Sequence, residues 1–260
     1  IERAAVVKPE QRQVKRVVAE IVGKNAIIID EDADLDEAVP AILHSALGFQ
    51  GQKCSACSRL IVLDAVHDRL VGRLVDAAKG WKLGPSEDPS HQMGALIDGN
   101  ALAKFREYAT IAKEEGHLAF EADTGSDQNL APITIVAGIK ATHRIAREEV
   151  FGPLLAVICV EDFDEALEVA NSTEYALTGG LFSRTPSHLE RAKSEFEVGN
   201  LYLNRGITGA LVGRQAFGGA AMSGVGSKAG GPDYLLQFMN PKVVTENTMR
   251  RGFAPDADMD

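Results

Sequence analysis

Residues 34–63 read D-L-D-E-A-V-P-A-I-L-H-S-A-L-G-F-Q-G-Q-K-C-S-A-C-S-R-L-I-V-L, which joins a helical pattern to a strand pattern through a polar loop. Apolar residues recur at helical spacing up to Phe49, and acidic residues stand in the first turn, where they suit the helix dipole. Leu60 to Leu63 form a short apolar run that is typical of a buried strand. Cys54 lies on the loop between the two patterns, where a turn can direct its sulfur into a cleft.

The residues around Cys54 favour a reactive thiol. Lys53 precedes it, Ser55 follows it, and the loop carries free N–H groups, all of which favour the thiolate. The thiolate is the form that attacks a carbonyl carbon. A buried structural cysteine is the alternative, but small polar neighbours argue against burial in a core. The sequence therefore predicts a catalytic nucleophile.

Cys54 and Cys57 also form a C-x-x-C pair. A redox pair of this kind follows a strand and opens a helix, whereas this one follows a helix and precedes a strand. A zinc site needs two further ligands at matching spacing. Cys159 lies in an apolar run that predicts a core position, and the six His residues are scattered. We expect neither a redox nor a metal role.

The composition bounds the class of protein. The chain has 260 residues, enough for one large domain or two small ones, and carries 27 basic against 37 acidic side chains. A net charge of −10 argues against a general nucleic-acid or anionic-membrane surface, and no apolar run reaches the ~18 residues of a membrane span. Three cysteines without a framework of pairs suit a reducing compartment, the cytoplasm or the mitochondrial matrix.

Strand and helix patterns alternate along the chain. After a lead over 9–22, helical or extended, strands are predicted at 25–30, 60–63, 118–120, 133–136, 154–160, 177–183, 200–204 and 242–246, and helices at 32–49, 66–81, 101–115, 164–171 and 187–196. The stretch 143–152 is expected as a polar loop. This order predicts an α/β fold with a mostly parallel open sheet flanked by helices. The long Gly-rich stretch 205–231 is expected to be functional, because such long loops seldom are idle.

Three motifs resemble the aldehyde dehydrogenase superfamily, in matching order and over essentially the whole chain. The Cys54 loop resembles its nucleophile loop, E-E-V-F-G-P at 148–153 its cofactor motif, and E-I-V-G-K at 20–24 its general-base motif. N-R-G-I-T-G-A at 204–210 and Q-A-F-G-G at 215–219 are similar to the branch that oxidises L-glutamate γ-semialdehyde.

This resemblance implies a mechanism and a set of site residues. Cys54 would add to the aldehyde, hydride would pass to NAD+, and water activated by Glu20 would cleave the thioester. The Cys54 N–H would hold part of the oxyanion. Glu149 would accept hydrogen bonds from the nicotinamide ribose, and Phe151 would pack near the cofactor. The substrate-binding residues implied are Lys53, Ser55, Gly209, Ala210 and Phe217.

The resemblance also predicts the domain organisation. Residues 1–24 are expected to be a junction from a missing NAD-binding domain, 25–239 the catalytic domain, and 240–260 a C-terminal oligomerisation strand and tail. Such a chain would be part of a longer homo-oligomeric enzyme and poorly active alone. The longer protein could carry a fused proline dehydrogenase domain. Val22 replaces a glycine of the family motif, and a β-branched residue tolerates positive φ poorly.

Two other functions stay open at this point. The chain could be a catalytically silent assembly domain of the same fold, or an acyl-transferring relative that passes its thioester to coenzyme A. The carboxylate of Glu20 favours hydrolysis over transfer to coenzyme A.

Overall fold

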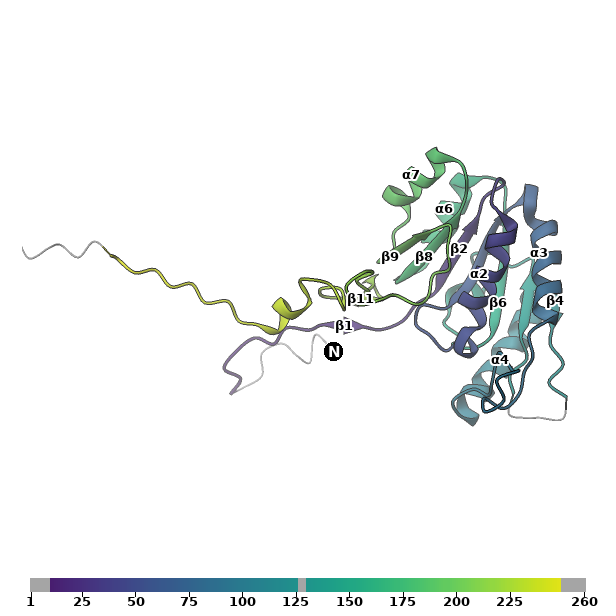
Figure 1. The fold of residues 1–260 in the computed structure, drawn as a ribbon, viewed down its shortest axis with the longest axis horizontal. Helices are drawn as coiled ribbons and strands as arrows, with labels where there is room; N and C mark the ends of the chain where they lie inside the picture. The colour runs from purple at the N-terminus through teal and green to yellow at the C-terminus, as the bar shows by residue number, and fades with distance from the viewer. Residues whose placement is uncertain (1–9, 126–129, 249–260) are drawn as a thin grey trace, which may run out of the picture.

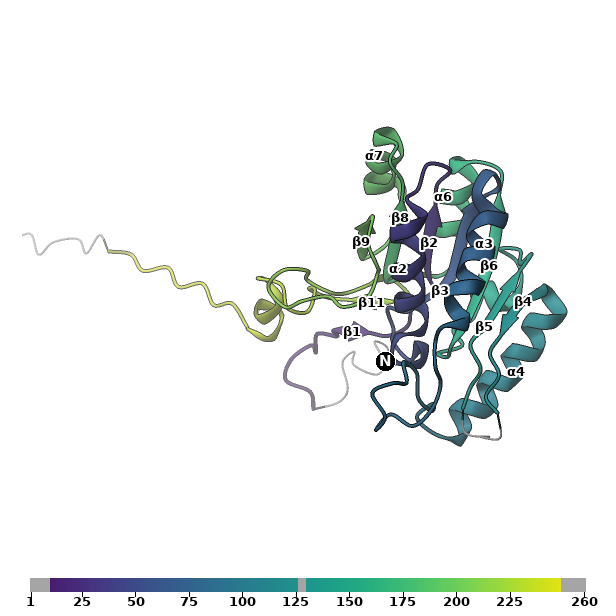
Figure 2. The same cartoon turned by 45° about the vertical axis from the view of Figure 1, so that its right-hand side comes forward.

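The computed structural model describes residues 10–125 and 130–248. The chain forms a body built around one sheet, together with an arm that leaves it (Figures 1 and 2). The segment before β2 and the segment after β9 run together into that arm, so the two ends of the described chain lie on the same side of the body.

The body is organised by a seven-stranded sheet of order β4-β5-β6-β3-β2-β8-β9. Its strands are β2 (Asn25–Ile29), β3 (Cys57–Leu63), β4 (His117–Glu121), β5 (Thr134–Ala137), β6 (Leu154–Val160), β8 (Thr178–Phe182) and β9 (Asn200–Leu203). All neighbouring pairs are parallel except β4 and β5. The prediction of a mostly parallel α/β sheet is therefore confirmed.

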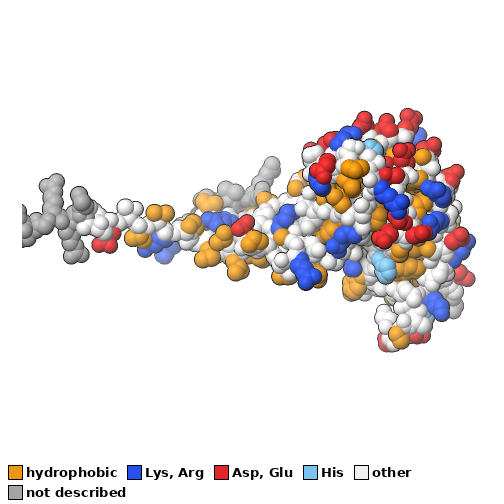
Figure 3. Space-filling model, turned by 45° about the horizontal axis from the view of Figure 1, so that its top comes forward, with side chains coloured by type: hydrophobic (Ala, Val, Ile, Leu, Met, Phe, Trp, Pro, Cys, Tyr) orange, Lys and Arg blue, Asp and Glu red, His pale blue; other side chains and the backbone are white. Residues whose placement is uncertain are grey.

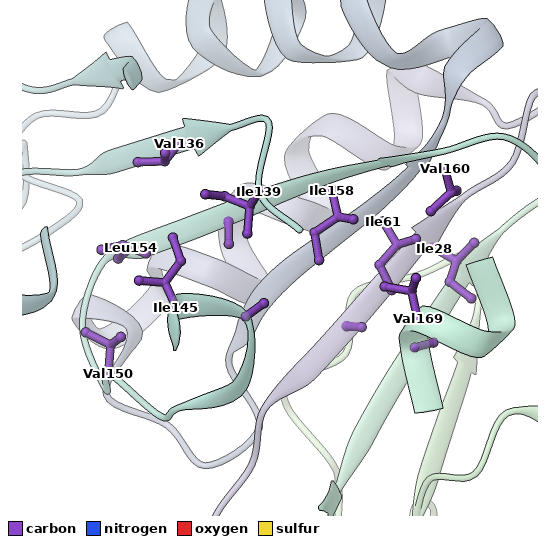
Figure 4. Close-up of a cluster of buried hydrophobic side chains, with 14 of the residues drawn as sticks. Ile28, Ile61, Val136, Ile139, Ile145, Val150, Leu154, Ile158, Val160 and Val169 are labelled. Carbon is purple, nitrogen blue, oxygen red and sulfur yellow. The ribbon is translucent and has the colours of Figure 1, made fainter. Parts of the chain in front are cut away.

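Helices cover both faces of this sheet, which leaves the central strands buried on both sides (Figure 1). The helices are α2 (Leu35–Leu47), α3 (Asp64–Lys79), α4 (Gly99–Glu115), α5 (Arg144–Arg147), α6 (Phe163–Asn171) and α7 (Pro186–Glu195). On β2, Ile27 and Ile29 pack with α2 and α3, whereas Ile28 packs with the opposite layer. Figure 4 shows that second layer, where Ile28, Ile61 and Ile158 line up across β2, β3 and β6.

The arm is made of short pairings and exposed apolar side chains. Strand β1 (Ala19–Glu20) pairs antiparallel with β11 (Gly224–Val225), and β7 (Tyr175–Ala176) with β10 (Ala220–Ala221). The 3₁₀ helix η2 (Tyr234–Phe238) follows. Hydrophobic side chains gather along the arm in Figure 3, and those more than half exposed include Leu235, Leu236, Phe238, Met239, Val243 and Val244.

The structure differs from the sequence-based expectation at three places. Residues 242–246 have no strand partner within the described chain, so the strand predicted there is absent from this single chain. The loop expected at 143–152 contains α5. Cys159 was predicted in the core and is exposed, because its Sγ faces the polar Asp64 at 3.5 Å, a neighbour that an apolar run cannot reveal.

None of the described helices combines the length and the hydropathy that crossing a membrane requires.

Candidate active site

The loop that carries Cys54 is strained and anchored. It leaves α2 through the 3₁₀ turn η1 (Gly48–Gly51), in which Phe49 and Gln50 have φ values of 57° and 59°. This left-handed conformation costs a non-glycine residue roughly 1–2 kcal/mol, and such strain clusters at functional sites. Gln52 Oε1 accepts a hydrogen bond of 2.9 Å from the Ile97 N–H. Cys54 therefore lies on a backbone that its surroundings hold in place.

Asn25, the first residue of β2, ties this loop to the central sheet. Its Nδ2 donates to the carbonyl oxygens of Cys54 at 2.7 Å and Ala56 at 2.8 Å. Its Oδ1 accepts from the Thr178 N–H of β8 at 3.0 Å, and the residue is buried. Sequence reasoning took Asn25 only as a strand residue, although a polar side chain opening a buried strand was the available signal.

The general-base segment lies directly on the nucleophile loop. A Cβ on Gly23 would stand 2.2 Å from the Cys54 carbonyl oxygen, so only glycine permits this approach. The Glu20 carboxylate lies close enough to the Cys54 thiol to raise its pKa. Glu20 is held by the antiparallel pairing of β1 with β11. Val22 avoids positive φ, so the strain expected for a β-branched residue is not present.

The charge state of Cys54 differs from the sequence-based expectation. Burial first, and then the hydrogen bond to the Glu20 carboxylate and its negative charge, raise the pKa of the Cys54 thiol to about 11. The N–H groups of Ser55 and of Cys54 itself lower that pKa, as expected, but are outweighed. The prediction of a thiolate at rest was therefore wrong. The thiol is protonated at neutral pH, with a carboxylate beside it to receive the proton.

The acidic loop 148–153 packs on the same loop from the other side. A Cβ on Gly51 would meet the Gly152 carbonyl oxygen at 2.5 Å. Glu149 Oε1 accepts a hydrogen bond of 3.2 Å from the Gly23 N–H, while the Lys104 ammonium donates to the Glu149 carbonyl oxygen at 2.8 Å. Burial raises the pKa of the Glu149 carboxyl, and the Gly23 N–H opposes that rise. All three motifs thus meet around Gly23.

A small recess of about 20 Å³ lies between these segments. Lys53, Ser58, Glu149 and Phe151 are among the residues that line it. The Ser58 Oγ is buried there without a hydrogen-bond partner in the described chain. Phe151 is 41% exposed and has a φ of 62°, so its ring stands open at the edge of the site. A volume of this size holds about one water molecule.

The second cysteine of the C-x-x-C pair is separate from the site chemistry. Cys57 is 2% exposed, and burial raises the pKa of its thiol to about 12. Its Sγ donates to the Arg59 carbonyl oxygen at 3.3 Å. No disulfide joins Cys54, Cys57 and Cys159, which are free thiols.

Arg59 is a buried cation that links three elements. It is 2% exposed, and its guanidinium donates to the carbonyl oxygens of Lys24 at 3.0 Å, Val169 at 2.9 Å and Ala170 at 2.9 Å. The last two carbonyls belong to the C-terminal turn of α6, where the helix dipole favours a positive charge. Arg59 therefore joins the general-base segment to β3 and to the layer of helices behind the sheet.

The implied substrate loop is less closely tied to Cys54. Its start is fixed to α2, because the Ile207 N–H donates to Ser45 Oγ at 3.1 Å. Phe217 pairs with Ala229 through backbone hydrogen bonds of 2.9 and 2.6 Å. Gly209 is exposed, and Ala210 and Phe217 are half-buried. Within the described residues no hydrogen bond joins these three to the Cys54 loop, so their substrate-binding role stays a prediction. Residues 10–125 and 130–248 also contain no cluster of three or more His, Cys, Asp or Glu side chains arranged for a metal ion.

The α/β fold, together with the grouping of Cys54, Glu20 and the loop 148–153, can be compared with known proteins. The aldehyde dehydrogenase family matches residues 3–244, so the chain belongs to that family. Among curated relatives, the 1-pyrroline-5-carboxylate dehydrogenase of Geobacillus sp. (strain WCH70) is 50% identical over 247 residues, which are 94% of this chain and 48% of the relative. The Bacillus subtilis (strain 168) protein of the same name is 47% identical over the same shares. The chain thus spans about half the length of the curated relatives it matches.

Solved structures give the same result for the fold. Proline utilization A from Bdellovibrio bacteriovorus superposes with a TM-score of 0.93 at 55% identity, covering 97% of this chain and 26% of that one. The 1-pyrroline-5-carboxylate dehydrogenase from Thermus with bound NAD has a TM-score of 0.87 at 45% identity, covering 91% and 46%.

Proposed function

We propose that this chain supplies the catalytic portion of an NAD+-dependent dehydrogenase that oxidises L-glutamate γ-semialdehyde to L-glutamate. The observation that carries the proposal is the position of the Glu20 carboxylate beside the Cys54 thiol, close enough to raise the pKa of that thiol. A protonated thiol beside a carboxylate is a nucleophile paired with its base. The names of the relatives supply the substrate class, because 1-pyrroline-5-carboxylate is the cyclic form of that semialdehyde.

The first step is addition of Cys54 to the aldehyde carbon. Glu20 takes the thiol proton as the sulfur forms a bond to the carbonyl carbon, and the carbonyl oxygen becomes an oxyanion. The Cys54 N–H is one donor for that oxyanion, and a donor fixed before the reaction stabilises it without reorganising. Asn25 contributes by donating a hydrogen bond of 2.7 Å to the Cys54 carbonyl oxygen, which fixes the peptide between Cys54 and Ser55.

The second step is hydrolysis of a thioester on Cys54. When bound, NAD+ would accept the hydride that leaves the thiohemiacetal carbon. Once Glu20 has released its first proton, its carboxylate can take a proton from water as the water oxygen attacks the thioester carbon. Collapse of that adduct breaks the carbon–sulfur bond and leaves a carboxylic acid and the Cys54 sulfur.

The residues around Glu149 suit the nicotinamide ribose of a cofactor. An ionised carboxylate is an acceptor, and within the described chain the Glu149 side chain accepts one hydrogen bond, which leaves capacity for ribose hydroxyls. The Ser58 Oγ in the adjoining recess is a polar group without a hydrogen-bond partner in the described chain. Phe151, exposed beside them, offers an aromatic surface for packing.

Substrate recognition would fall to the residues implied by the sequence. Ser55 and backbone N–H groups at Gly209 and Ala210 would bind the substrate carboxylate, Lys53 would add a positive charge, and Phe217 would cover the methylene chain. Gly209 has a φ of 81° and open space on its Cβ side, which suits a backbone that receives a ligand.

An ester substrate tests this proposal without any cofactor. Cys54 should be acylated by p-nitrophenyl acetate at pH 9 with a burst of p-nitrophenolate, followed by slower turnover as Glu20 activates water. Glu20→Gln should keep the burst and lower the steady rate roughly 10²–10⁴-fold, while exposed Glu107→Gln on α4 should change neither. A burst that survives Cys54→Ala, or no burst at all, contradicts the proposal and favours an assembly domain. Release of acetyl-CoA on adding coenzyme A would favour the acyl-transferring relative.

The exposed arm suggests assembly within a larger protein. Val243 and Val244 are 90% and 75% exposed and extended, so they could add a strand to the sheet of a second copy. The match to bifunctional proline utilization A makes fusion to a proline dehydrogenase domain a further expectation. The expected compartment stays the cytoplasm or the mitochondrial matrix. A single monomeric species in sedimentation, unchanged by Val243→Lys, would contradict assembly through this strand.

A further inference from the structure

The carboxyl ends of the central strands form an edge that the proposed chemistry does not use. Cys54 precedes β3 and Asn25 opens β2, so the candidate active site lies at the amino ends of these parallel strands. At the other end, the neighbouring strands β2 and β8 lead into helices on opposite faces of the sheet, because α2 packs in one hydrophobic layer and α7 in the other. Open α/β sheets usually bind their ligands at such a point. This edge is therefore the expected place for a further ligand.

A cavity of about 240 Å³ opens at this point, on the side of the sheet that α2 and α3 cover. Three arginines line it, namely Arg69 and Arg73 from α3 and Arg184 from the loop between β8 and α7. Asp34 and Asp36, at the start of α2, are the acidic residues in its wall. With three positive charges against two negative ones, the cavity is basic in a chain whose net charge is −10.

Hydrogen bonds between two loops fix the position of Arg184. The Arg184 N–H donates to Asp32 Oδ1 at 2.9 Å, and Thr185 Oγ1 donates to Asp32 Oδ2 at 2.9 Å. On the other side, Ser183 Oγ donates to the buried Asp30 carboxylate at 2.6 Å. Arg184 therefore lies between two residues that are tied to the loop between β2 and α2, so its backbone is in place before any ligand arrives.

The acidic residues of the cavity do not neutralise all three arginines. Arg73 forms an ion pair with Asp36. Arg184 forms one with Asp34 at 2.5 Å. Within residues 10–125 and 130–248, Arg69 forms no ion pair. Arg69 and Arg73 are four residues apart on α3, a spacing at which like charges repel each other. An anion bound in the cavity would relieve that repulsion.

We propose that this cavity is a binding site for a phosphate group, held by the guanidinium groups of Arg69, Arg73 and Arg184. Arginine binds phosphate through parallel N–H···O bonds and stays charged at any physiological pH. A phosphate has more acceptor oxygens than a carboxylate, so it can bind several arginines at once. Pockets for drug-sized ligands measure roughly 300–1,000 Å³, so a cavity of about 240 Å³ suits a small phosphate.

Phosphate titrations of the complete 260-residue chain test this inference. Inorganic phosphate is added at an ionic strength held constant with sodium chloride, and the side-chain Nε–H signals of ¹⁵N-labelled arginine are followed by NMR. The signals of Arg69, Arg73 and Arg184, each assigned by its own change to Gln, should shift together and saturate. Arg69→Gln should weaken phosphate binding about tenfold or more, the loss expected for one charge-assisted hydrogen bond.

Arg12→Gln is the matched control, because Arg12 is an exposed arginine on the arm and its change removes the same charge. It should leave the affinity for phosphate nearly unchanged, since salt screens a distant exposed charge. Arg69→Lys keeps the charge but loses the planar fork, so it should bind phosphate more weakly than the parent does. The midpoints of urea unfolding without phosphate should agree among these proteins, which separates a loss of binding from a loss of folding.

A second titration distinguishes free phosphate from phosphate carried by an organic molecule. Tighter binding of glycerol 3-phosphate than of inorganic phosphate assigns the site to an organic phosphate, whereas equal or weaker binding assigns it to the free anion. Shifts that do not saturate, or equal phosphate affinities of Arg69→Gln and Arg12→Gln, overturn the inference. Either result is independent of the proposed dehydrogenase chemistry, because neither Cys54 nor Glu20 takes part.

Discussion

Asn25 Nδ2 lies 2.7 Å from the carbonyl oxygen of Cys54 and donates a hydrogen bond to it. A Cβ added to Gly23 would lie only 2.2 Å from the same carbonyl oxygen, which is too close for any side chain. The peptide that follows the proposed nucleophile is therefore held by a side chain from β2, and the segment that carries Glu20, the proposed general base, packs against it. The relative position of Cys54 and Glu20 therefore depends on Asn25 and Gly23.

Gly23→Ala should destabilise the chain and separate Glu20 from Cys54. The added Cβ meets backbone at 2.2 Å, and backbone cannot move aside as a flexible side chain can. Overpacking of this kind costs roughly 1–3 kcal/mol or more in the free energy of unfolding, measured by urea denaturation. Gly72→Ala is the control, because its Cβ on the exposed face of α3 meets nothing within 4 Å, and it should gain roughly 0.5–1 kcal/mol. Equal effects of the two changes would contradict this account of the contact.

The thiol of Cys54 should react slowly at neutral pH. With a pKa of about 11, its alkylation by iodoacetamide should keep rising with pH well above 9. Glu20→Gln removes a charge that raises this pKa, so the rate at pH 7.5 should increase although a catalytic group has been lost. The measurement uses a Cys159→Ser background, because Cys159 is exposed and would react as well. An apparent thiol pKa near 7 in the parent protein would show that the loop N–H groups and Lys53 outweigh burial and the Glu20 carboxylate.

Lys24 should make stability depend on pH between 7 and 10.5. Burial lowers its pKa to about 7 in the folded chain, against 10.5 when unperturbed, so over this range the unfolded state binds a proton that the folded state lacks. The free energy of unfolding therefore rises with pH, by up to about 1.4 kcal/mol per pH unit from this one group. Lys24→Met should remove that rise and increase stability at pH 7. Exposed Lys140→Met should leave the urea-unfolding profile against pH unchanged, and a Lys24→Met profile parallel to the parent's would disprove the assignment.

Arg59→Lys should be strongly destabilising even though it keeps the charge. A lysine cannot present the planar fork that reaches the Lys24, Val169 and Ala170 carbonyls together. Leaving buried carbonyls unsatisfied costs roughly 1–3 kcal/mol, to be read from the midpoint of urea unfolding at constant m-value. Arg69→Lys, on the exposed side of α3, should stay within about 0.5 kcal/mol of the parent. A small effect at Arg59 would mean that water replaces these hydrogen bonds.

The sequence alone determined the layers of the fold and indicated Cys54 as the candidate nucleophile. Buried strands such as 154–160 are recognisable in the sequence because both of their faces are covered, which makes them continuously apolar. Helices such as 66–81 are recognisable because only one face is covered, which gives apolar residues at helical spacing. Cys54, Glu20 and Glu149 were identifiable because each lies in a short motif of distinctive residues. The sequence could not decide whether 242–246 forms a strand, because a strand needs a partner and the described single chain provides none there.

Tertiary structure decided how those residues behave. The pKa of Cys54 is raised because burial and Glu20 act through space, and neither distance nor dielectric environment can be read from neighbours in sequence. Asn25 and Arg59 gained their roles in the same way, through contacts with residues 29 to 153 positions away in the chain. Local patterns record what each segment must hide from water, whereas charge and orientation at a site follow from which segments the fold brings together.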